Sequence, residues 1–203
     1  MLPAISADGT MIVIAKSEPF RGEPYVTGRH PSLDLMVMTR GDTVAKHLRV
    51  LSADEADVMF DAGGMKPELR ARVVDANRWL AEIDRHYHLV ALESLEVVRA
   101  LDMPSHVRSH AVGSGITVDW VASQLEVVQR HEPGGPKRTL VHATTAASWL
   151  VPDHPTTCAT SPPNLETVYG DVAHDVIVLE IGYGGLDPAT CIRPPSQVHV
   201  VAW

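Results

Sequence analysis

The chain has 203 residues, which is enough for one full hydrophobic core. Its 25 acidic and 17 basic residues give a formal charge of -8 at pH 7. Nucleic acids and anionic lipid surfaces attract proteins through clustered cations, so this balance excludes both as the main partner. No apolar run approaches the roughly 20 residues that a membrane-spanning helix needs, so no membrane span is expected.

The N-terminal sequence and the cysteines bear on the compartment. Met1 is followed by Leu2 and Pro3, without the basic region and apolar segment of a signal peptide. If Met1 is the natural start, we expect a cytoplasmic protein. If a leader precedes this sequence in the natural protein, we expect the periplasm or cell envelope. The 15 prolines in polar loops, and the position of Cys158 and Cys191 in the loop-rich C-terminal third, favour the second interpretation.

Cys158 and Cys191 are predicted to form a disulfide. On the chain-entropy model, closing the loop between them stabilises an unstrained fold by about 3 to 4 kcal/mol. The alternative is a pair of buried or idle thiols, which spacing alone does not exclude. A redox pair is disfavoured, because the two residues lack the close spacing that lowers a thiol pKa in redox motifs.

The first quarter of the chain has the pattern of an antiparallel meander. Asp8 and Gly9 mark a turn into an apolar strand at residues 10–15. After a long polar loop, residues 33–38 and 44–51 are predicted as two strands joined by a tight turn. Asp8 is expected to serve the geometry of the first turn.

The order of motifs within residues 3–51 carries a resemblance. A Ser-x-Asp-Gly opening is followed by an apolar strand, a Leu-x-Leu-Met-Val-Met strand and a Gly-Asp turn. This arrangement resembles one blade of the TolB-type β-propeller repeats, with Ala7 where that repeat usually has proline. No tandem copies follow at the period of a propeller. The resemblance implies an antiparallel meander in an exported bacterial protein, and it implies no activity.

Two helices are predicted after this meander. Ser52 and Glu55 have the spacing of a capping box, so a short helix is expected from there to residue 58 or 60. Segment 67–85 has apolar residues at helical spacing, and Pro67 suits the first helical position. Its apolar stripe consists of Leu69, Val73, Ala76, Leu80 and Ile83. A helix with one such face needs a sheet on which to pack.

The remainder of the chain is predicted to be mostly β. The clearest turn lies at residues 132–136, so a hairpin is expected around it. A surface loop is expected at 152–164. The last strand is expected inside a sheet or on its edge, with Trp203 covering the core. The predicted strands are 87–98, as one or two strands, then 115–121, 124–130, 137–143, 176–181 and 197–201.

Together these elements predict an α+β fold. We expect a mostly antiparallel twisted sheet built from two meanders, with one long amphipathic helix packed on one face. One domain is expected over residues 1–203, composed of an N-terminal meander at 3–51, a helical segment at 52–86 and a C-terminal β meander at 87–203. The Gly-Tyr-x-Gly-x-Asp…Cys pattern at 182–191 resembles the C-termini of uncharacterised exported bacterial proteins. That resemblance implies no activity.

The eleven histidines are the residues most able to carry chemistry. On a strand, two histidines at alternate positions lie on one face about 7 Å apart, and a third ligand would complete a metal site. The candidate ligands are His86, His88, His106, His110 and His142, with zinc or copper as the metal. No His-Glu-x-x-His or Cys-x-x-Cys motif accompanies them. The alternative is a scattered set of solvated or hydrogen-bonded histidines.

No motif identifies a catalytic residue. The chain lacks Gly-x-Ser-x-Gly, and Ser114 lies in a predicted turn before a strand rather than in a strand-to-helix elbow. The glycines at 182–185 follow a strand without opening a helix, so they are not predicted to bind phosphate.

These observations favour a non-catalytic function. We expect an extracytoplasmic binding or accessory module of a bacterial envelope, whose partner is an unknown protein or small ligand. One alternative is a histidine-rich metal-binding protein or small metal-dependent enzyme, and another is a cytoplasmic structural or interaction protein. Copies of the chain are expected to be able to associate through an uncovered sheet edge.

Overall fold

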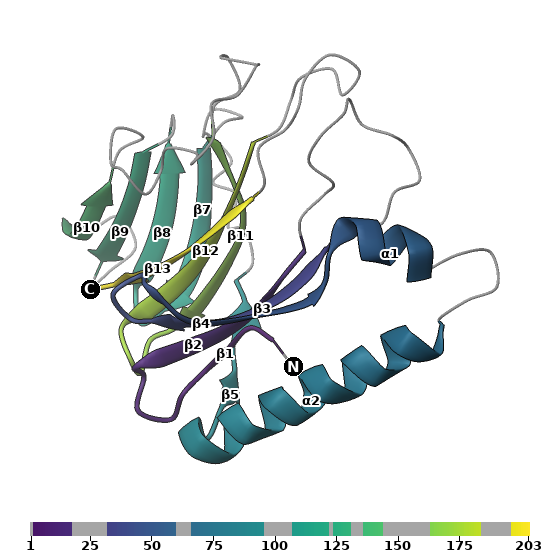
Figure 1. Cartoon of the computed structure of the whole chain (residues 1–203). Coiled ribbons are helices and arrows are strands. Elements are labelled where there is room, and N and C mark those ends of the chain that lie inside the picture. The colour runs from purple at the N-terminus through teal and green to yellow at the C-terminus, as the bar shows by residue number, and fades with distance from the viewer. Residues whose placement is uncertain are drawn as a thin grey trace, which may run out of the picture. The chain divides into compact units, whose positions relative to one another are not determined.

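The computed structural model describes residues 2–17, 32–59, 66–95, 107–121, 124–130, 136–143, 163–183 and 196–203. These residues divide into two compact units, the first ending at Leu92 and the second beginning at Glu93. Figure 1 shows the elements of each unit. The single domain expected from the sequence stays a prediction.

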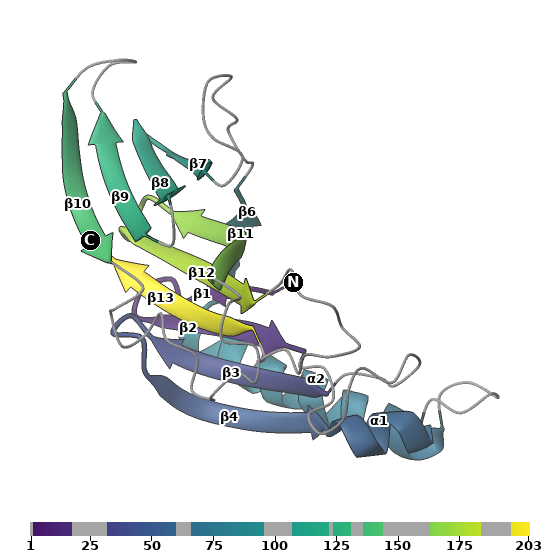
Figure 2. The ribbon, with the colours of Figure 1, turned by 90° about the horizontal axis from the view of Figure 1, so that it is seen from above.

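The first unit contains a five-stranded antiparallel sheet, in the order β4-β3-β2-β1-β5. Its strands are β1 Ala4–Ile5, β2 Met11–Lys16, β3 Leu33–Thr39, β4 Val44–Leu51 and β5 Val90–Ala91. Figure 2 shows β2, β3 and β4 side by side. The strands predicted at 10–15, 33–38 and 44–51 are confirmed, and consecutive strands pair as a meander.

Successive residues of the inner strand β2 are buried. Val13 of β2 and Val37 of β3 form a cluster with Ile83 of a helix on one face. Because side chains alternate along a strand, Ile12 and Ile14 lie on the opposite face, where they are also buried. The burial of Ile12, Val13 and Ile14 agrees with the continuous apolar run in the sequence of β2.

Helix α1, Ala53–Met59, begins at the predicted capping box. The Ser52 N–H donates to Oε2 of Glu55 at 2.9 Å, and the Glu55 N–H donates to Oγ of Ser52 at 3.3 Å. Each side chain thus satisfies a backbone donor that has no partner within the helix. The capping box is confirmed.

Helix α2, Pro67–Tyr87, is the long helix that the apolar spacing predicts, and it extends two residues past the expected end. Pro67 occupies the beginning of the helix, and His88 ends it in the left-handed conformation with φ of 52°. The buried residues of α2 belong to three clusters with other parts of the first unit. These clusters are Ile83 with Val13 and Val37, Ala76 with Leu35 and Val50, and Leu69 with Leu51 and Ala56.

The second unit contains two four-stranded antiparallel sheets, in the orders β10-β9-β8-β7 and β13-β12-β11-β6. The strands of the first sheet are β7 Val107–Gly113, β8 Ile116–Val121, β9 Gln124–Arg130 and β10 Lys137–Ala143. Those of the second are β6 Glu93–Ser94, β11 Pro163–Asp171, β12 Val176–Tyr183 and β13 Gln197–Ala202. The strands predicted at 115–121, 124–130, 137–143, 176–181 and 197–201 are confirmed. Pairing of Arg130 with Lys137 confirms the hairpin around 132–136.

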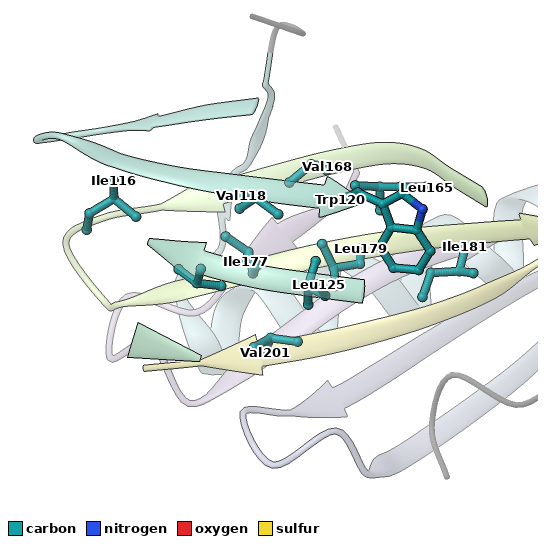
Figure 3. Packing of buried hydrophobic residues seen from close by; sticks show 11 residues of the cluster. Ile116, Val118, Trp120, Leu125, Leu165, Val168, Ile177, Leu179, Ile181 and Val201 are labelled. Atoms are coloured by element: carbon teal, nitrogen blue, oxygen red, sulfur yellow. The ribbon is translucent and has the colours of Figure 1, made fainter. Parts of the chain in front are cut away.

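The core of the second unit lies between its two sheets (Figure 3). One sheet contributes alternate residues of β8, and the other contributes alternate residues of β12. Trp203 packs against this cluster from beyond β13, as expected from the sequence. The residues of β8 are Ile116, Val118 and Trp120, and those of β12 are Ile177, Leu179 and Ile181. A core shared by two sheets gives this unit its own hydrophobic centre.

The structure corrects two expectations. The described strands form three sheets rather than the expected one. The C-terminal half divides into two sheets because the sheet of β7 to β10 and the sheet of β6 and β11 to β13 bury their apolar faces against each other. The strand expected from residue 87 is also wrong, since Tyr87 is the last residue of α2. Beyond it, β5 and β6 are strands of two residues each.

Candidate functional site

A pocket of about 320 Å³ lies in the first unit beside α2. Helix α2, strand β1 and strand β5 provide its walls, together with residues that flank these strands. The lining residues are Leu2, Ala4, Leu80, Ala81, Asp84, Leu89 and Ala91. Pockets that hold small ligands begin at about 300 Å³, so this one is at the small end of that range.

Small side chains leave this space open. Ala4 of β1 pairs directly with Ala91 of β5, so two methyl groups lie where larger side chains would fill the pocket. Ala81 of α2 is the third alanine of the lining, next to Leu80. Asp84 lies one helical turn beyond Leu80, which brings its carboxylate to the same side of α2.

Asp84 is the single ionisable residue in the lining. Its Oδ1 accepts a hydrogen bond of 2.9 Å from the N–H of Leu89, and its backbone oxygen accepts one of 2.7 Å from the N–H of His88. The first bond fixes the direction of the carboxylate. Among the described residues, no donor to Oδ2 is found.

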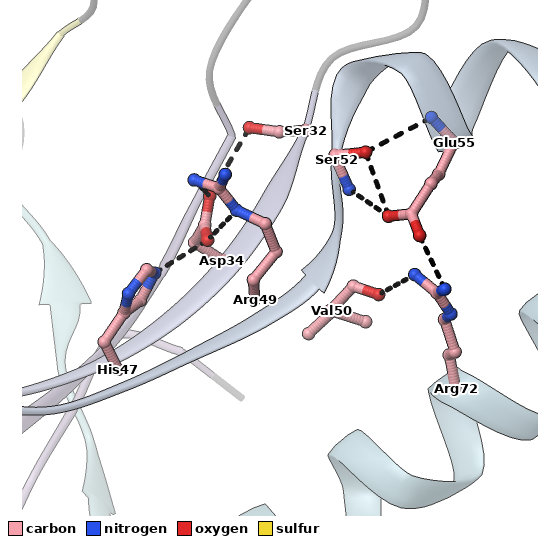
Figure 4. A network of polar contacts seen from close by, with 8 residues as sticks. All are labelled: Ser32, Asp34, His47, Arg49, Val50, Ser52, Glu55 and Arg72. Atoms are coloured by element: carbon pink, nitrogen blue, oxygen red, sulfur yellow. Dashed lines mark hydrogen bonds and ion pairs between the residues drawn. The ribbon is translucent and has the colours of Figure 1, made fainter.

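A second polar site of the first unit is centred on Asp34 of β3 (Figure 4). Its side chain is 4% exposed, whereas those of His47 and Arg49 on β4 are 46% and 55% exposed. Nε2 of His47 donates to Oδ1 at 2.7 Å, and Nε of Arg49 donates to the same oxygen at 3.0 Å. Oδ2 accepts from Nη2 of Arg49 and from Oγ of Ser32, each at 3.4 Å.

These partners keep Asp34 ionised. Burial by itself raises the pKa of a carboxyl group, because it removes water from the charged form. The hydrogen bonds from Arg49 and His47 outweigh burial, so the pKa of Asp34 lies below its ordinary value. A carboxylate held in this state is poorly suited to give or take a proton near neutral pH. Its role is structural.

A neighbouring network joins α1 to α2 and β4 (Figure 4). Nη2 of Arg72 donates to Oε1 of Glu55 at 2.6 Å, and Nη1 donates to the backbone oxygen of Val50 at 3.4 Å. The hydrogen bond from Arg72, together with those from the backbone and hydroxyl of Ser52, lowers the pKa of Glu55 to about 2. The carboxylate of Glu55 is therefore held by hydrogen bonds within the fold, as that of Asp34 is.

Asp8 serves the turn between β1 and β2, as expected. Its Oδ1 accepts hydrogen bonds from Oγ of Ser6 at 2.6 Å and from the N–H and Oγ1 of Thr10 at 3.1 and 2.8 Å. The bonds from Ser6 and Thr10 lower the pKa of Asp8 to about 2. Gly9 completes the turn with φ of 70°.

The structure does not place His86 and His88 on a strand. His86 lies in the last turn of α2, and His88 is the residue that ends the helix. The geometry that was expected to bring both rings to one face of a strand is therefore wrong. The ring of His86 instead meets that of Tyr87 edge to face, with centroids 4.5 Å apart.

The other candidate metal ligands belong to the second unit or lie outside the described residues. His110 is buried on β7, and its Nδ1 donates to the backbone oxygen of Leu95 at 3.1 Å. His142 lies on β10, at the opposite edge of the same sheet, so the two backbones are separated by roughly 14 Å at the usual strand spacing. His106 lies outside the described residues, as do Cys158 and Cys191. No group of three or more potential ligands suited to a metal ion occurs in the described ranges.

No family model, no curated protein and no solved structure matches this chain. Within the part of the chain that the structure describes, no helix is long and apolar enough to cross a membrane.

Proposed function

We propose that this protein is a non-catalytic binding or accessory module of a bacterial envelope, and that it binds a small apolar ligand beside α2. The pocket of about 320 Å³ is the observation that carries this proposal. Six of its seven lining residues are leucine or alanine, and burying apolar ligand surface against them is favourable. The export of the protein is supported by the resemblance of residues 3–51 to a TolB-type blade and by the predicted pairing of Cys158 with Cys191.

The walls of the pocket are suited to binding. We propose that α2 covers one face of the five-stranded sheet as a rigid element, with Ile83 seated on Val13 and Val37. Antiparallel pairing of β1 with β5 fixes the opposite wall. A pocket formed by packed secondary structure needs little ordering when a ligand enters, which favours affinity.

The proposed site is tested with n-hexanol as a neutral apolar probe. In the ¹⁵N-labelled protein, we expect hexanol to shift the backbone amide signals of Ala81, Leu89 and Ala91. Ala81→Leu should abolish these shifts, because the larger side chain fills the pocket while keeping a residue of good helix propensity. Ala71→Leu is the control, since Ala71 is an exposed alanine of the same helix outside the pocket. Equal binding by wild type and Ala81→Leu would contradict the proposed site.

A further inference from the structure

We infer that the ligand of the pocket beside α2 is a free primary alkylammonium compound, an apolar chain that ends in one –NH₃⁺ group. This inference rests on the proposed function, because it assigns a chemical class to the ligand of the same site. It starts from the contrast between the carboxylate of Asp84 and the other lining side chains, which are all leucine or alanine.

Asp84 determines which polar group a ligand can bring. An ionised carboxylate only accepts hydrogen bonds, so its partner must be a donor. A cationic donor forms a bond that is shorter and roughly twice as strong as that of a neutral donor. An anionic ligand would be repelled by the same group.

The position of Asp84 on α2 is a second reason to expect a cationic ligand. Asp84 lies in the last turn of α2, where unpaired backbone carbonyls give the helix end a partial negative charge. Arg85 and His86 lie in the same turn, but neither lines the pocket. The lining therefore combines a carboxylate with the negative end of a helix.

The bond from Leu89 selects among cations. Because Oδ1 of Asp84 already accepts from the N–H of Leu89, a ligand has Oδ2 to bind. A primary ammonium needs a single acceptor for one of its N–H groups. A guanidinium makes its best pair with a carboxylate through two parallel bonds, which require both oxygens. The site therefore favours an ammonium over a guanidinium.

The apolar part of the ligand follows from the remaining lining. Leu2, Leu80 and Leu89 offer aliphatic surface next to the carboxylate, and the alanines leave room for a chain. Each methylene group of an unbranched alkyl chain that loses contact with water should tighten binding roughly fourfold. The alkyl chain of the ligand thus contributes affinity, and its ammonium group contributes selectivity.

The test compares probes that share one chain length. The wild-type protein is titrated with n-hexylammonium, n-hexanol, n-hexanoate and n-hexylguanidinium, and binding is followed by the amide signals of Ala81, Leu89 and Ala91. Because Asp84 is exposed, hexylammonium is expected to bind at most about fivefold more tightly than hexanol, and hexanoate is expected to bind most weakly. Hexylguanidinium should bind less tightly than hexylammonium.

Two variants test the role of Asp84 itself. Asp84→Asn should reduce the affinity for hexylammonium to that for hexanol, while its amide oxygen can still accept from the N–H of Leu89. Asp75→Asn is the matched control, because Asp75 is an exposed carboxylate of the same helix outside the pocket. Thermal melts of both variants establish that the fold is intact.

The outcomes separate this inference from the proposed function. If hexanol and hexanoate bind as tightly as hexylammonium, or if Asp84→Asn keeps the preference, the ligand class is wrong although the pocket binds. If no probe shifts the three amide signals, the proposed site itself is wrong. If N-acetyl-lysine N-methylamide binds more tightly than hexylammonium, the ammonium group is that of a lysine in a protein partner. The inference of a free alkylammonium ligand is then wrong.

Discussion

Asp34 illustrates how a single buried charge depends on residues that are distant in sequence. Its partners His47 and Arg49 lie 13 and 15 positions away, on the strand that pairs with β3. The sequence predicts the hairpin, but the ion pairs follow only once the register aligns Asp34 with Arg49. The capping box of Ser52 and Glu55 was predictable because its two residues lie within one helical turn.

We predict that Arg49→Thr lowers the free energy of unfolding by about 1 to 3 kcal/mol. The variant leaves the Asp34 carboxylate buried with fewer hydrogen bonds, and an unsatisfied buried charge is costly. Threonine is chosen because it suits an edge strand. Urea denaturation measures the change.

The control for this prediction is a double-mutant cycle. In the background of Asp34→Asn, the same Arg49→Thr change should cost markedly less, because no buried charge remains to be compensated. Additive costs would show that Arg49 stabilises the protein by some other contact.

Acid should destabilise the protein through Glu55. The pKa of Glu55 is lowered from 4.5 to about 2 in the folded protein, so the unfolded chain binds the proton more readily. The stabilisation is present above about pH 4.5 and is lost as the pH falls toward 2. We therefore expect the melting temperature of Glu55→Gln to fall less than that of the wild type between pH 5 and pH 2. Identical slopes would contradict this assignment, since Asp8 and the other carboxylates are the same in both proteins.

At the scale of elements, the long helix was predictable and its end was not. Leu80, Ile83 and Tyr87 continue the helical spacing of three and four residues into a segment whose composition favours strands. Such short apolar segments are ambiguous when read alone. The end of α2 depends on the left-handed backbone conformation of His88 and on the hydrogen bond from the N–H of Leu89 to the carboxylate of Asp84. Neither feature has a sequence signature.

Strand β11 was missed because a bulge interrupts its alternation. Leu165 and Val168 are three positions apart, yet both are buried in the same core. The register with β12 shifts between Leu165 and Thr167, which accounts for the odd spacing. A pattern search with a period of two cannot recognise such a strand.

We predict that Gly170→Ala in β11 lowers the free energy of unfolding by about 1 to 3 kcal/mol, as overpacking of a core does. A methyl group at Gly170 would lie 2.9 Å from Cγ1 of Val112 and 3.0 Å from Cδ1 of Leu95. Chemical denaturation measures the loss. The combination with Leu95→Ala should recover part of it, because the shorter side chain makes room.

Gly41→Ala is the matched control for this prediction. The nearest atom to a methyl group at Gly41 is Oγ1 of Thr39 at 3.7 Å, an ordinary contact distance. Its stability should stay close to that of the wild type. If both glycine variants lose the same stability, the crowding around Gly170 is not the cause.

At the scale of the molecule, the number of sheets could not be predicted from the sequence. The partners of the short strands are remote, since Glu93 of β6 pairs with Gly170 and Val90 of β5 pairs with Ile5. Composition and local pattern correctly predict a mostly antiparallel, β-rich chain. They do not determine which strands pair when the strands are far apart in the sequence. The pocket depends on one such pairing, because β1 pairs with β5 at its wall.

The proposed export makes a prediction for the whole chain. Protein taken from its native compartment and unfolded without reductant should show no free thiol, because Cys158 and Cys191 are predicted to be bonded. A thiol-reactive chromophore measures this directly, with the reduced protein as the control. Two free sulfhydryl groups would argue against an oxidising compartment and would favour the cytoplasmic alternative.

The position of strand β4 at the edge of its sheet affects how the protein aggregates at high concentration. It is the outermost described strand of its sheet, and an outermost strand is a template for fibril growth by edge-to-edge pairing. Lys46 and Arg49 are exposed along it. A second copy approaching this edge would bring like charges together, which opposes polymerisation. Arg49, which compensates Asp34, thus also helps to keep one molecule from seeding the aggregation of the next.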